Sequence, residues 1–325
     1  MAQPVLELKQ LQTYFFSAQG RRVVKAVDGV SFTLNPGATL GIVGESGSGK
    51  TVTSMSILRL LPAAARIVGG EIWFQGENLL TKSEREMRAL RGSQVTMILQ
   101  DPMMSLNPLF TVGEQIAEPL RIHRQMRGTG LLERIKELLR GVRIPSPEVR
   151  LREYPHQMSG GMRQRIVGAI GISCEPQLLI ADEPTTSLDV TIQAQYLSLL
   201  KDIQKQSHLA MIFITHNIGI IAKMCDDVGV MYAGKLVERA PVRTIFNHPA
   251  HPYTEALLHA VPSLTDRSER LWSIEGQPPD LTNPPAGCPF NPRCPKAEDR
   301  CRREVPPEFQ VGDNHYTRCW LWERR

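Results

Sequence analysis

A glycine-rich segment near the start of the chain constrains the fold more than any other feature. Residues 44–51 read Gly-Glu-Ser-Gly-Ser-Gly-Lys-Thr and match the phosphate-loop pattern G-x-x-x-x-G-K-S/T at every required position. A short apolar run at 38–43 precedes the segment, and residues 52–61 have helical apolar spacing that stops before Pro62. Strand, glycine-rich loop and helix form the context that a phosphate loop requires, so the segment predicts an α/β fold that binds a nucleotide.

The residue types of this loop predict its chemistry. Glycines let backbone N–H groups turn inward around phosphate oxygens, and the helix that begins near Gly49 points its positive end at them. Lys50 is expected to reach the β- and γ-phosphates, and Thr51 is expected to hold Mg²⁺. The residues that we expect to bind ATP in this segment are Gly44, Ser46, Gly47, Gly49, Lys50 and Thr51.

An acidic strand end supplies the matching metal and water chemistry. Residues 178–183 read Leu-Leu-Ile-Ala-Asp-Glu, an apolar strand that carries Asp182 to its C-terminal end. Ligands of open α/β sheets bind at that end of the strands, where Asp182 would hold Mg²⁺. Glu183 is placed to polarise a water molecule for attack on the γ-phosphate.

A second phosphate-binding turn lies upstream of this strand. Ser159, Gly160 and Gly161 stand at the predicted start of a helix, where backbone N–H groups attract anions. The turn is separate from the loop at 44–51. Two phosphate-binding segments in one chain indicate a protein that closes when nucleotide binds, and not a simple nucleotide pocket.

Strand and helix signals alternate along most of the chain. Strands are expected at 5–11, 23–34, 38–43, 71–74, 95–99, 177–180 and 210–215, and a helix at 190–206. Ser83 to Glu86 has the spacing of a helix capping box, and residues 111–141 predict a helical insert with Pro119 as a local break. The alternation predicts a mostly parallel sheet covered by helices. Apolar periodicity fades after residue 240, so we expect a domain boundary near 241.

The bulk composition is that of a globular protein in the cytosol. No apolar run reaches the roughly 18 residues that a membrane span needs, and the N-terminus lacks the features of a signal peptide. The formal net charge is a modest +5, and arginine-rich stretches at 85–91 and 121–152 are expected to be solvated helix faces. The composition therefore predicts no binding of nucleic acid.

The motifs, in this order and over nearly the whole chain, resemble the ATP-binding subunit of an ABC transporter. The resemblance implies a P-loop NTPase cassette at 1–240, with a helical subdomain at about 103–168 and a small cysteine-rich extension at 241–325. It implies that Gln100 touches Mg²⁺ or the attacking water and that His216 contacts the γ-phosphate.

The same resemblance implies two further contacts with nucleotide. Asp189 belongs to the D-loop of the family, at the cassette–cassette interface. An aromatic residue upstream of the phosphate loop stacks on adenine, and Phe15 is chosen for this role, although Tyr14 and Phe16 are adjacent. The turn at residues 159–161 is the signature turn of the family. Cassettes of this family pair head to tail, so that the signature turn of one chain binds the γ-phosphate held by the phosphate loop of its partner.

Three segments are similar to the branch of the family that imports peptides. They are Ser-Gly-Gly-Met-Arg-Gln-Arg at 159–165, Asp-Pro-Met-Met-Ser-Leu-Asn-Pro at 101–108 and His-Pro-Tyr-Thr-Glu-Ala-Leu-Leu at 251–258. The branch implies a peripheral ATPase on the cytoplasmic face of the membrane that powers import of di- or oligopeptides. It implies a heterodimer with a second cassette, two membrane permease subunits and an extracytoplasmic solute-binding protein.

Two other functions stay open at this stage. An importer for nickel, glutathione or another small solute would use the same subunit design, because this subunit does not touch the solute. A soluble ABC ATPase that acts on nucleic acid or ribosomes is disfavoured, since such proteins usually carry two cassettes or long inserts, and this chain has neither.

Four of the six cysteines cluster near the C-terminus. Cys288, Cys294, Cys301 and Cys319 have the spacing C-x5-C-x6-C-x17-C within a proline-rich stretch that has few core residues. Disulfides are disfavoured in the cytosol, and the C-x2-4-C knuckles of structural zinc are absent from the sequence. Four thiolates suit a 4Fe-4S cluster, which some members of the branch carry, while zinc and free or redox-active thiols stay as alternatives.

Overall fold

The computed structural model describes residues 3–17, 22–101, 105–186, 188–260 and 274–323. The chain divides into two compact units, each built from segments that are separate in sequence. Unit 1 comprises Met1–Val5, Asn35–Ala38 and Thr81–Ile212, and unit 2 comprises Leu6–Leu34, Thr39–Leu80 and Phe213–Arg325. The phosphate loop therefore belongs to unit 2, whereas the acidic strand end and the signature turn belong to unit 1.

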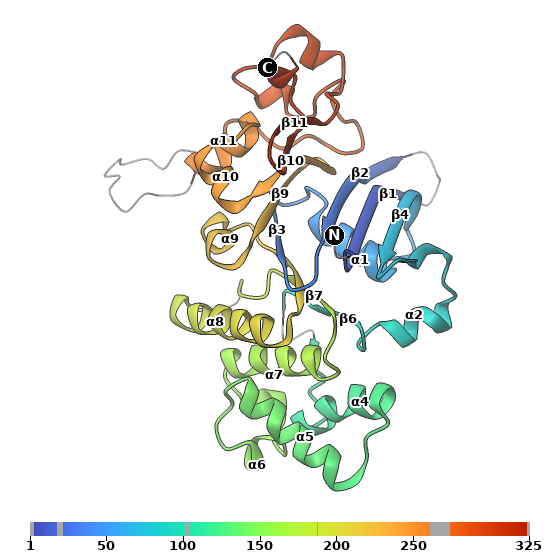
Figure 1. Ribbon diagram of the computed structural model, residues 1–325, viewed down its shortest axis with the longest axis vertical. Helices are drawn as coiled ribbons and strands as arrows, with labels where there is room; N and C mark the ends of the chain where they lie inside the picture. The colour runs from blue at the N-terminus through green and yellow to red at the C-terminus, as the bar shows by residue number, and fades with distance from the viewer. Residues whose placement is uncertain (1–2, 18–21, 102–104, 187, 261–273, 324–325) are drawn as a thin grey trace. The chain divides into compact units, whose positions relative to one another are not determined.

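An antiparallel sheet forms the N-terminal part of unit 2 (Figure 1). Its strands, in the order β2-β1-β4-β5, are β2 (Val23–Leu34), β1 (Leu6–Phe16), β4 (Ala65–Phe74) and β5 (Glu77–Asn78). The expected strand at 23–34 is confirmed, but β1 extends five residues beyond the predicted end at 11, because it pairs on both edges as far as Phe16. Buried Leu6, Leu8 and Leu11 hold this sheet to the core.

Strand β4 starts earlier than the sequence predicts. Gly69 and Gly70 were expected to precede the strand, but they lie inside it, where the register of β1 and β4 shifts between Lys9 and Gln12. Gly70 has φ +86°, and a Cβ atom there would lie 2.4 Å from the carbonyl oxygen of Gln10. The two glycines therefore allow a bulge within a continuous strand, which a sequence pattern cannot distinguish from a turn.

The second sheet of unit 2 is mixed. Strand β3 (Thr39–Val43) pairs in parallel with β9 (Asp227–Tyr232), and the other pairs, β9 with β10 (Lys235–Pro241), β10 with β12 (His315–Thr317) and β12 with β11 (Phe309–Gly312), are antiparallel. The β3–β9 pair is parallel, as the prediction of a mostly parallel sheet requires, and the strands after Tyr232 add antiparallel pairs at one edge. The helices of unit 2 are α1 (Lys50–Leu58), α9 (Ile218–Met224), α10 (Val242–Asn247) and α11 (Pro252–His259).

Unit 1 contains a parallel strand pair and the helical insert. Strand β6 (Val95–Ile98) pairs in parallel with β7 (Leu178–Asp182), as predicted, and β8 (Ala210–Ile214) begins in this unit and ends in unit 2. Its helices are α2 (Glu84–Leu90), α4 (Val112–Arg124), α5 (Gly128–Gly141), α6 (Pro147–Arg150), α7 (Gly160–Ile172) and α8 (Val190–Ser207). Figure 1 shows α4, α5 and α6 gathered beside α7. Short 3-10 turns in the two units are η1 (Leu79–Thr81), η2 (Pro155–Gln157), η3 (Asn291–Arg293), η4 (Asp299–Arg302) and η5 (Trp320–Trp322).

The helix ends follow local capping chemistry, with one correction. The predicted capping box of Ser83 and Glu86 is present at the start of α2. Pro119, predicted to break the insert, lies inside α4, and the chain instead breaks at Gln125, which has a left-handed conformation. A capping box begins α4 and a buried stripe that includes Ile116 and Leu120 holds it, so the helix continues past the proline.

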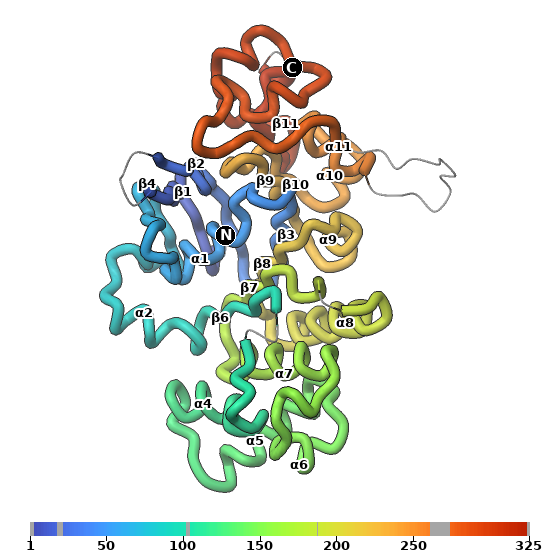
Figure 2. The backbone as a smooth tube through the Cα atoms, turned by 180° about the vertical axis from the view of Figure 1, so that it is seen from behind, coloured from blue at the N-terminus to red at the C-terminus, as the bar shows by residue number. Residues whose placement is uncertain are grey.

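The C-terminal part of unit 2 shares a buried centre with the strand that precedes it. The carboxylate of Glu238 in β10 is 1% exposed and accepts hydrogen bonds from the backbone N–H groups of Ala250 and His251 at 2.7 and 2.9 Å. His315 Nε2 lies 2.8 Å from the same carboxylate. Figure 2 shows the described residues after 273, in red, beside β10 and β11. The boundary near 241 stays a prediction, and these contacts cross it.

Candidate functional site

The phosphate loop is pressed against two strands of unit 2. A Cβ atom on Gly44 would lie 2.2 Å from the carbonyl oxygen of Met231 in β9, and one on Gly49 would lie 2.2 Å from that of Ala26 in β2. Gly49 also has φ +104°. No side chain fits at either position, so the motif glycines allow the loop to pack directly on the sheet.

Lys50 begins α1 and is almost completely buried. Its Nζ donates hydrogen bonds to the carbonyl oxygens of Gly44 at 2.8 Å and Glu45 at 2.9 Å. Gly49 is the N-cap of α1, so the first N–H groups of this helix point toward the loop, and Thr51, Ser46 and Gly47 are exposed. The loop thus brings together a buried ammonium, a helix N-terminus and exposed polar groups, an arrangement that suits a phosphate chain.

The three candidate aromatics for adenine differ in their surroundings. Tyr14 donates a hydrogen bond from its hydroxyl to Asp28, 2.8 Å away, and Phe16 lies under the guanidinium of Arg66. Phe15 alternates with both and shares its face of β1 with Thr13. The hydroxyl of Thr13 lies 2.8 Å from that of Ser56 in α1, the helix that follows the phosphate loop. This orientation favours Phe15 over its two neighbours for stacking on adenine.

His216 also belongs to unit 2. It lies two residues after the end of β8, is exposed, and precedes Asn217, whose side chain caps α9 by accepting a hydrogen bond from Gly219 N–H at 2.9 Å. The cap formed by Asn217 fixes the backbone next to His216, and the imidazole of His216 is exposed to solvent.

Unit 1 brings two of the predicted catalytic residues into contact. Asp182 ends the fully buried strand β7 and is 4% exposed. The next residue, Glu183, has φ +46°, a conformation that costs energy for a residue with a side chain and that concentrates at functional sites. Its Oε2 accepts hydrogen bonds from Gln100 Nε2 at 3.2 Å and from the hydroxyl of Thr186 at 3.0 Å. Two residues that are 83 positions apart in sequence therefore meet at one carboxylate, a contact that the sequence analysis did not predict.

The signature turn begins α7 and is open to solvent. Ser159 is exposed, and its hydroxyl oxygen accepts a hydrogen bond from Met162 N–H at 3.3 Å. A Cβ atom on Gly160 would meet nothing within 4 Å, whereas one on Gly161 would lie 2.6 Å from Ile192 of α8. Gly160 thus leaves room for an anion at the helix N-terminus, and Gly161 permits close packing of α7 on α8.

Asp189, the predicted D-loop acid, is the N-cap of α8. Its Oδ1 accepts hydrogen bonds from the N–H groups of Thr191 and Ile192, both at 3.0 Å. The next residue, Val190, is 81% exposed. The acid therefore holds the turn that presents an apolar side chain to solvent.

A large groove in unit 1 was not predicted from the sequence. It has a volume of about 790 Å³ and is lined by residues of the segment 105–110 and of α4. Phe110 and Ile122 in its wall are 51% and 64% exposed, and Leu109 next to it is 81% exposed. Gln115 holds the segment to α4, because it bonds to both the N–H and the carbonyl of Asn107. The apolar run Pro-Leu-Phe at 108–110 was the available signal for this surface.

The four C-terminal cysteines surround one small cavity in unit 2. All four are free and line a cavity of about 20 Å³, the space of roughly one water molecule. Burial raises the pKa of Cys288 to about 11 and that of Cys319 to about 12, so both thiols are protonated near neutral pH. This disfavours the alternative of reactive thiols, because the thiolate is the nucleophile.

The described residues do not support the predicted metal centre. Within them, no group of three or more His, Cys, Asp or Glu side chains is arranged so that it could hold a metal ion. The cysteines are the right donors for an iron–sulfur cluster, and all four line the same cavity. The zinc alternative has no support from these residues either.

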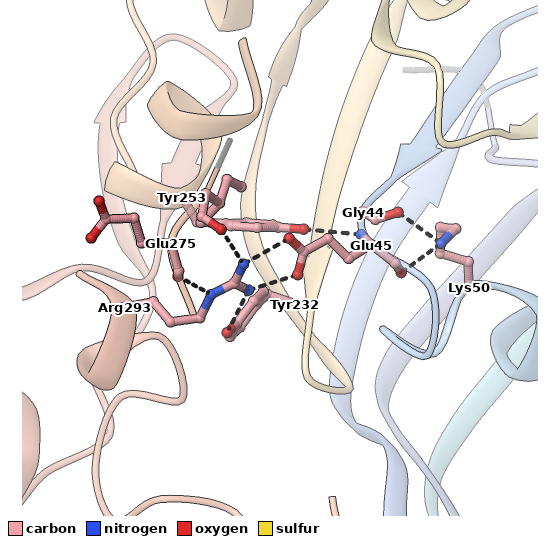
Figure 3. Close-up of polar contacts among 8 residues, drawn as sticks. Gly44, Glu45, Lys50, Tyr232, Tyr253, Glu275 and Arg293 are labelled. Atoms are coloured by element: carbon pink, nitrogen blue, oxygen red, sulfur yellow. Dashed lines mark hydrogen bonds and ion pairs between the residues drawn. The ribbon is translucent and has the colours of Figure 1, made fainter. Parts of the chain in front are cut away.

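Two residues that contact the phosphate loop were not predicted from the sequence. Arg293 binds the carboxylate of Glu45, and the hydroxyl of Tyr253 accepts a hydrogen bond from the N–H of Glu45 (Figure 3). The one available signal is Glu45 itself. A carboxylate inside a loop that binds anions requires a cation nearby, and the sequence could not identify which cation.

The comparisons with known proteins agree with this geometry. A family model described as ABC transporter matches residues 27–186, and one described as oligopeptide/dipeptide transporter, C-terminal region, matches residues 237–301. A probable peptide ABC transporter ATP-binding protein of Sinorhizobium fredii is 50% identical over 97% of this chain and 94% of its own length. The dipeptide transport ATP-binding protein DppD of Bacillus subtilis is 48% identical over 99% of this chain and 96% of its own length.

Solved structures share the fold at lower identity. A dimeric ATP-binding cassette in a post-hydrolysis state with ADP and Pi has a TM-score of 0.65 and is 23% identical over 73% of this chain and 99% of that one. A cassette of the cbiONQ transporter complex from Clostridium perfringens has a TM-score of 0.64 over 76% of this chain and 92% of that one. With full-length relatives near 50% identity, the chain belongs to the ATP-binding proteins of ABC transporters, in the oligopeptide/dipeptide branch.

Proposed function

We propose that this ATPase powers the import of di- and oligopeptides. The hydrogen bond between Gln100 and Glu183 at the end of β7 carries the catalytic part of the proposal, because it holds a carboxylate in place beside the metal-binding position. The assignment of the solute rests on relatives that match nearly the full length of the chain, since their names specify peptide, dipeptide or oligopeptide transport.

Unit 2 binds the nucleotide in this proposal. Backbone N–H groups of the loop and of the first turn of α1 bind the phosphates, Lys50 neutralises the β- and γ-phosphates, and Phe15 stacks on adenine. His216 contacts the γ-phosphate from the end of β8. Loss of ATP binding in Lys50→Ala, measured by titration with a fluorescent ATP analogue, tests this assignment, and unchanged affinity would contradict it.

Unit 1 supplies the water chemistry and the contact with a partner. Asp182 of this unit would hold Mg²⁺, which neutralises charge on the phosphates when bound, and Gln100 would touch the ion. The phosphate-loop motif gives a role in holding Mg²⁺ to Thr51 of unit 2 as well. Glu183 orients and deprotonates the attacking water. Ser159 and the N–H groups of the following glycines bind the γ-phosphate that the partner cassette holds, in a dimer stabilised by ATP.

The groove of unit 1 suits a membrane subunit. Within the part of the chain that the structure describes, no helix combines the length and the apolar character of a membrane span. A cytoplasmic helix of a permease subunit would place its apolar face against Phe110 and Ile122. The segment that lines this groove follows Gln100 within ten residues, which links permease binding to the group that contacts Glu183.

The remaining partners follow from the branch. A second, different cassette forms the dimer, an extracytoplasmic protein delivers the solute, and the chain is bound at the cytoplasmic face of the membrane. Affinity purification of the tagged chain from its own cells, with identification of the proteins that accompany it, tests this composition. Recovery of a dimer of this chain alone would contradict the heterodimer.

Reconstitution tests the solute. The purified complex in lipid vesicles, supplied with ATP, should take up labelled dipeptides and should show peptide-stimulated ATP hydrolysis. Glutathione and nickel ions serve as competitors in the same assay. Stimulation by either of them but not by dipeptides would assign the chain to the alternative importers.

We also propose a 4Fe-4S cluster on Cys288, Cys294, Cys301 and Cys319, as a secondary assignment. Its support is that all four thiols line one cavity and that none is in a disulfide. Protein purified without oxygen should contain iron and acid-labile sulfide, and their absence would refute the cluster.

A further inference from the structure

Glu45 is an unfavourable residue for a loop that binds ATP. It is the second residue of the phosphate loop, and its carboxylate would repel the phosphates unless a cation neutralises it. The cation in this structure is the guanidinium of Arg293, 248 residues further along the chain. It belongs to the segment from Cys288 to Cys319, which we call the four-cysteine region. The same region therefore determines the charge of the loop.

Arg293 binds the carboxylate of Glu45 with both arms of its guanidinium. Nη1 lies 2.7 Å from Oε2 and Nη2 lies 3.0 Å from Oε1 (Figure 3). The side chain of Arg293 is 5% exposed and that of Glu45 is 25% exposed, so solvent screens this pair much less than a surface ion pair. A two-armed contact also fixes the direction of the carboxylate, which a lysine could not do.

Arg293 is itself held in place. Its Nε donates to the carbonyl oxygen of Glu275 at 3.0 Å, and its Nη2 donates to that of Ile274 at 3.3 Å. Nη1 also donates to the hydroxyl of Tyr232 at 3.3 Å. The guanidinium thus joins η3, the segment at 274–275, strand β9 and the phosphate loop.

Tyr253 holds the backbone at the same residue. Its hydroxyl oxygen accepts a hydrogen bond from Glu45 N–H at 3.0 Å, and burial raises the pKa of this phenol well above its usual value. The ring packs against Tyr232 and Phe290, with centroid distances of 4.5 and 5.3 Å. Glu45 is therefore held at three groups: its N–H by Tyr253, its carboxylate by Arg293 and its carbonyl oxygen by Lys50 Nζ.

We propose that Arg293 and Tyr253 are positioning residues for ATP binding, through which the four-cysteine region controls the phosphate loop. Arg293 lies in η3, between Cys288 and Cys294, so the fold of the cysteine segment sets the position of the guanidinium. Loss of this position leaves the carboxylate of Glu45 unpaired beside the phosphates and weakens ATP binding. The inference rests on the proposed role of residues 44–51 as the ATP site.

The test combines two substitutions. Arg293→Gln in the full chain should weaken binding of Mg·ATP about tenfold, a common size for coupling between sites, because the carboxylate of Glu45 becomes unpaired. Glu45→Gln together with Arg293→Gln removes both charges and should restore most of the affinity. A purely structural role of Arg293 would not produce this recovery, so a double variant that binds as weakly as Arg293→Gln would overturn the proposal.

Matched controls separate the possible failures. Arg300→Gln breaks ion pairs with Glu304 and Glu323 in the same region without touching the loop, and it should leave ATP affinity unchanged. Lys50→Ala tests the ATP site itself, so intact binding in that variant would refute the site and not the positioning role. Thermal unfolding verifies that each variant is folded, and wild-type affinity in folded Arg293→Gln would refute the inference.

The cysteine segment provides a second measurement. Cys294→Ser should weaken ATP binding in the wild-type background, since it disturbs the residue next to Arg293. In the background of Glu45→Gln with Arg293→Gln, the same substitution should have no further effect. An equal loss in both backgrounds would show that the cysteine acts by another route.

Discussion

The two phosphate-binding elements of this chain are built in opposite ways. The loop of unit 2 is held by direct packing of Gly44 and Gly49 on strands and by the three contacts of Glu45. The signature turn of unit 1 is exposed, and a side chain added at Gly160 would meet no neighbouring atom within 4 Å. A preorganised loop binds its own ATP without loss of conformational freedom, whereas an open turn can accept a phosphate presented by another subunit.

The largest expected effect concerns unit 1 and leaves the loop intact. Glu183→Gln should lower kcat for ATP hydrolysis by about 10³-fold, because an amide cannot take the proton of the attacking water. ATP affinity should not change, and the variant should accumulate as an ATP-bound dimer, visible by size-exclusion chromatography. Glu175→Gln is the matched control, since Glu175 also has a positive φ, of 53°, but pairs with Arg134 on the surface. Normal turnover in Glu183→Gln would refute the proposed role.

A substitution in the signature turn tests whether it serves another subunit. Gly160→Glu adds a carboxylate in open space at the N-terminus of α7, so the fold should persist while an incoming phosphate is repelled. ATP hydrolysis should fall about 10²-fold, the size of effect seen when one anion-stabilising donor is lost, with unchanged ATP affinity of the chain. Gly141→Glu, also in open space in unit 1, is the control and should hydrolyse ATP normally. If Gly160→Glu loses its own ATP binding, the two elements are not independent.

The smallest expected effect is a pH dependence of the stability of unit 2, which carries the phosphate loop. Burial lowers the pKa of His251 to about 4, and its Nδ1 accepts a hydrogen bond from Tyr253 N–H. The nearby carboxylate of Glu238 raises this pKa, but burial outweighs it. Since the unfolded state binds this proton near pH 6.5, stability is complete above that pH and is lost as the pH falls toward 4.

Unfolding in denaturant at several pH values checks this prediction. The loss between pH 6.5 and 4 should be on the order of 2 kcal/mol. His251→Asn keeps an N-cap acceptor for α11 without a titrating group, so its stability should vary less over this range. An equal acid loss in wild type and variant would assign the effect to other groups.

Local patterns predicted much of the fold and most of the site. The ends of β2 and the capping box at Ser83 follow from short patterns in the sequence. The errors occurred where neighbours outweigh local preference. Pro119 continues a helix because its capping box and buried stripe hold it, and Gly70 forms a bulge because β1 crowds it.

The sequence alone determined which residues are predicted to bind phosphate, metal and water, because these groups act at fixed short spacings that the motifs record. Only the tertiary structure decided that Thr13, two residues before Phe15, contacts Ser56 of α1 and that Arg293 neutralises Glu45. A contact between residues 248 positions apart leaves no periodicity or motif in the chain, and it forms only when the C-terminal segment folds beside the loop. Short motifs thus predict the residues that bind ATP, while the contacts that support the phosphate loop exist only in the folded unit.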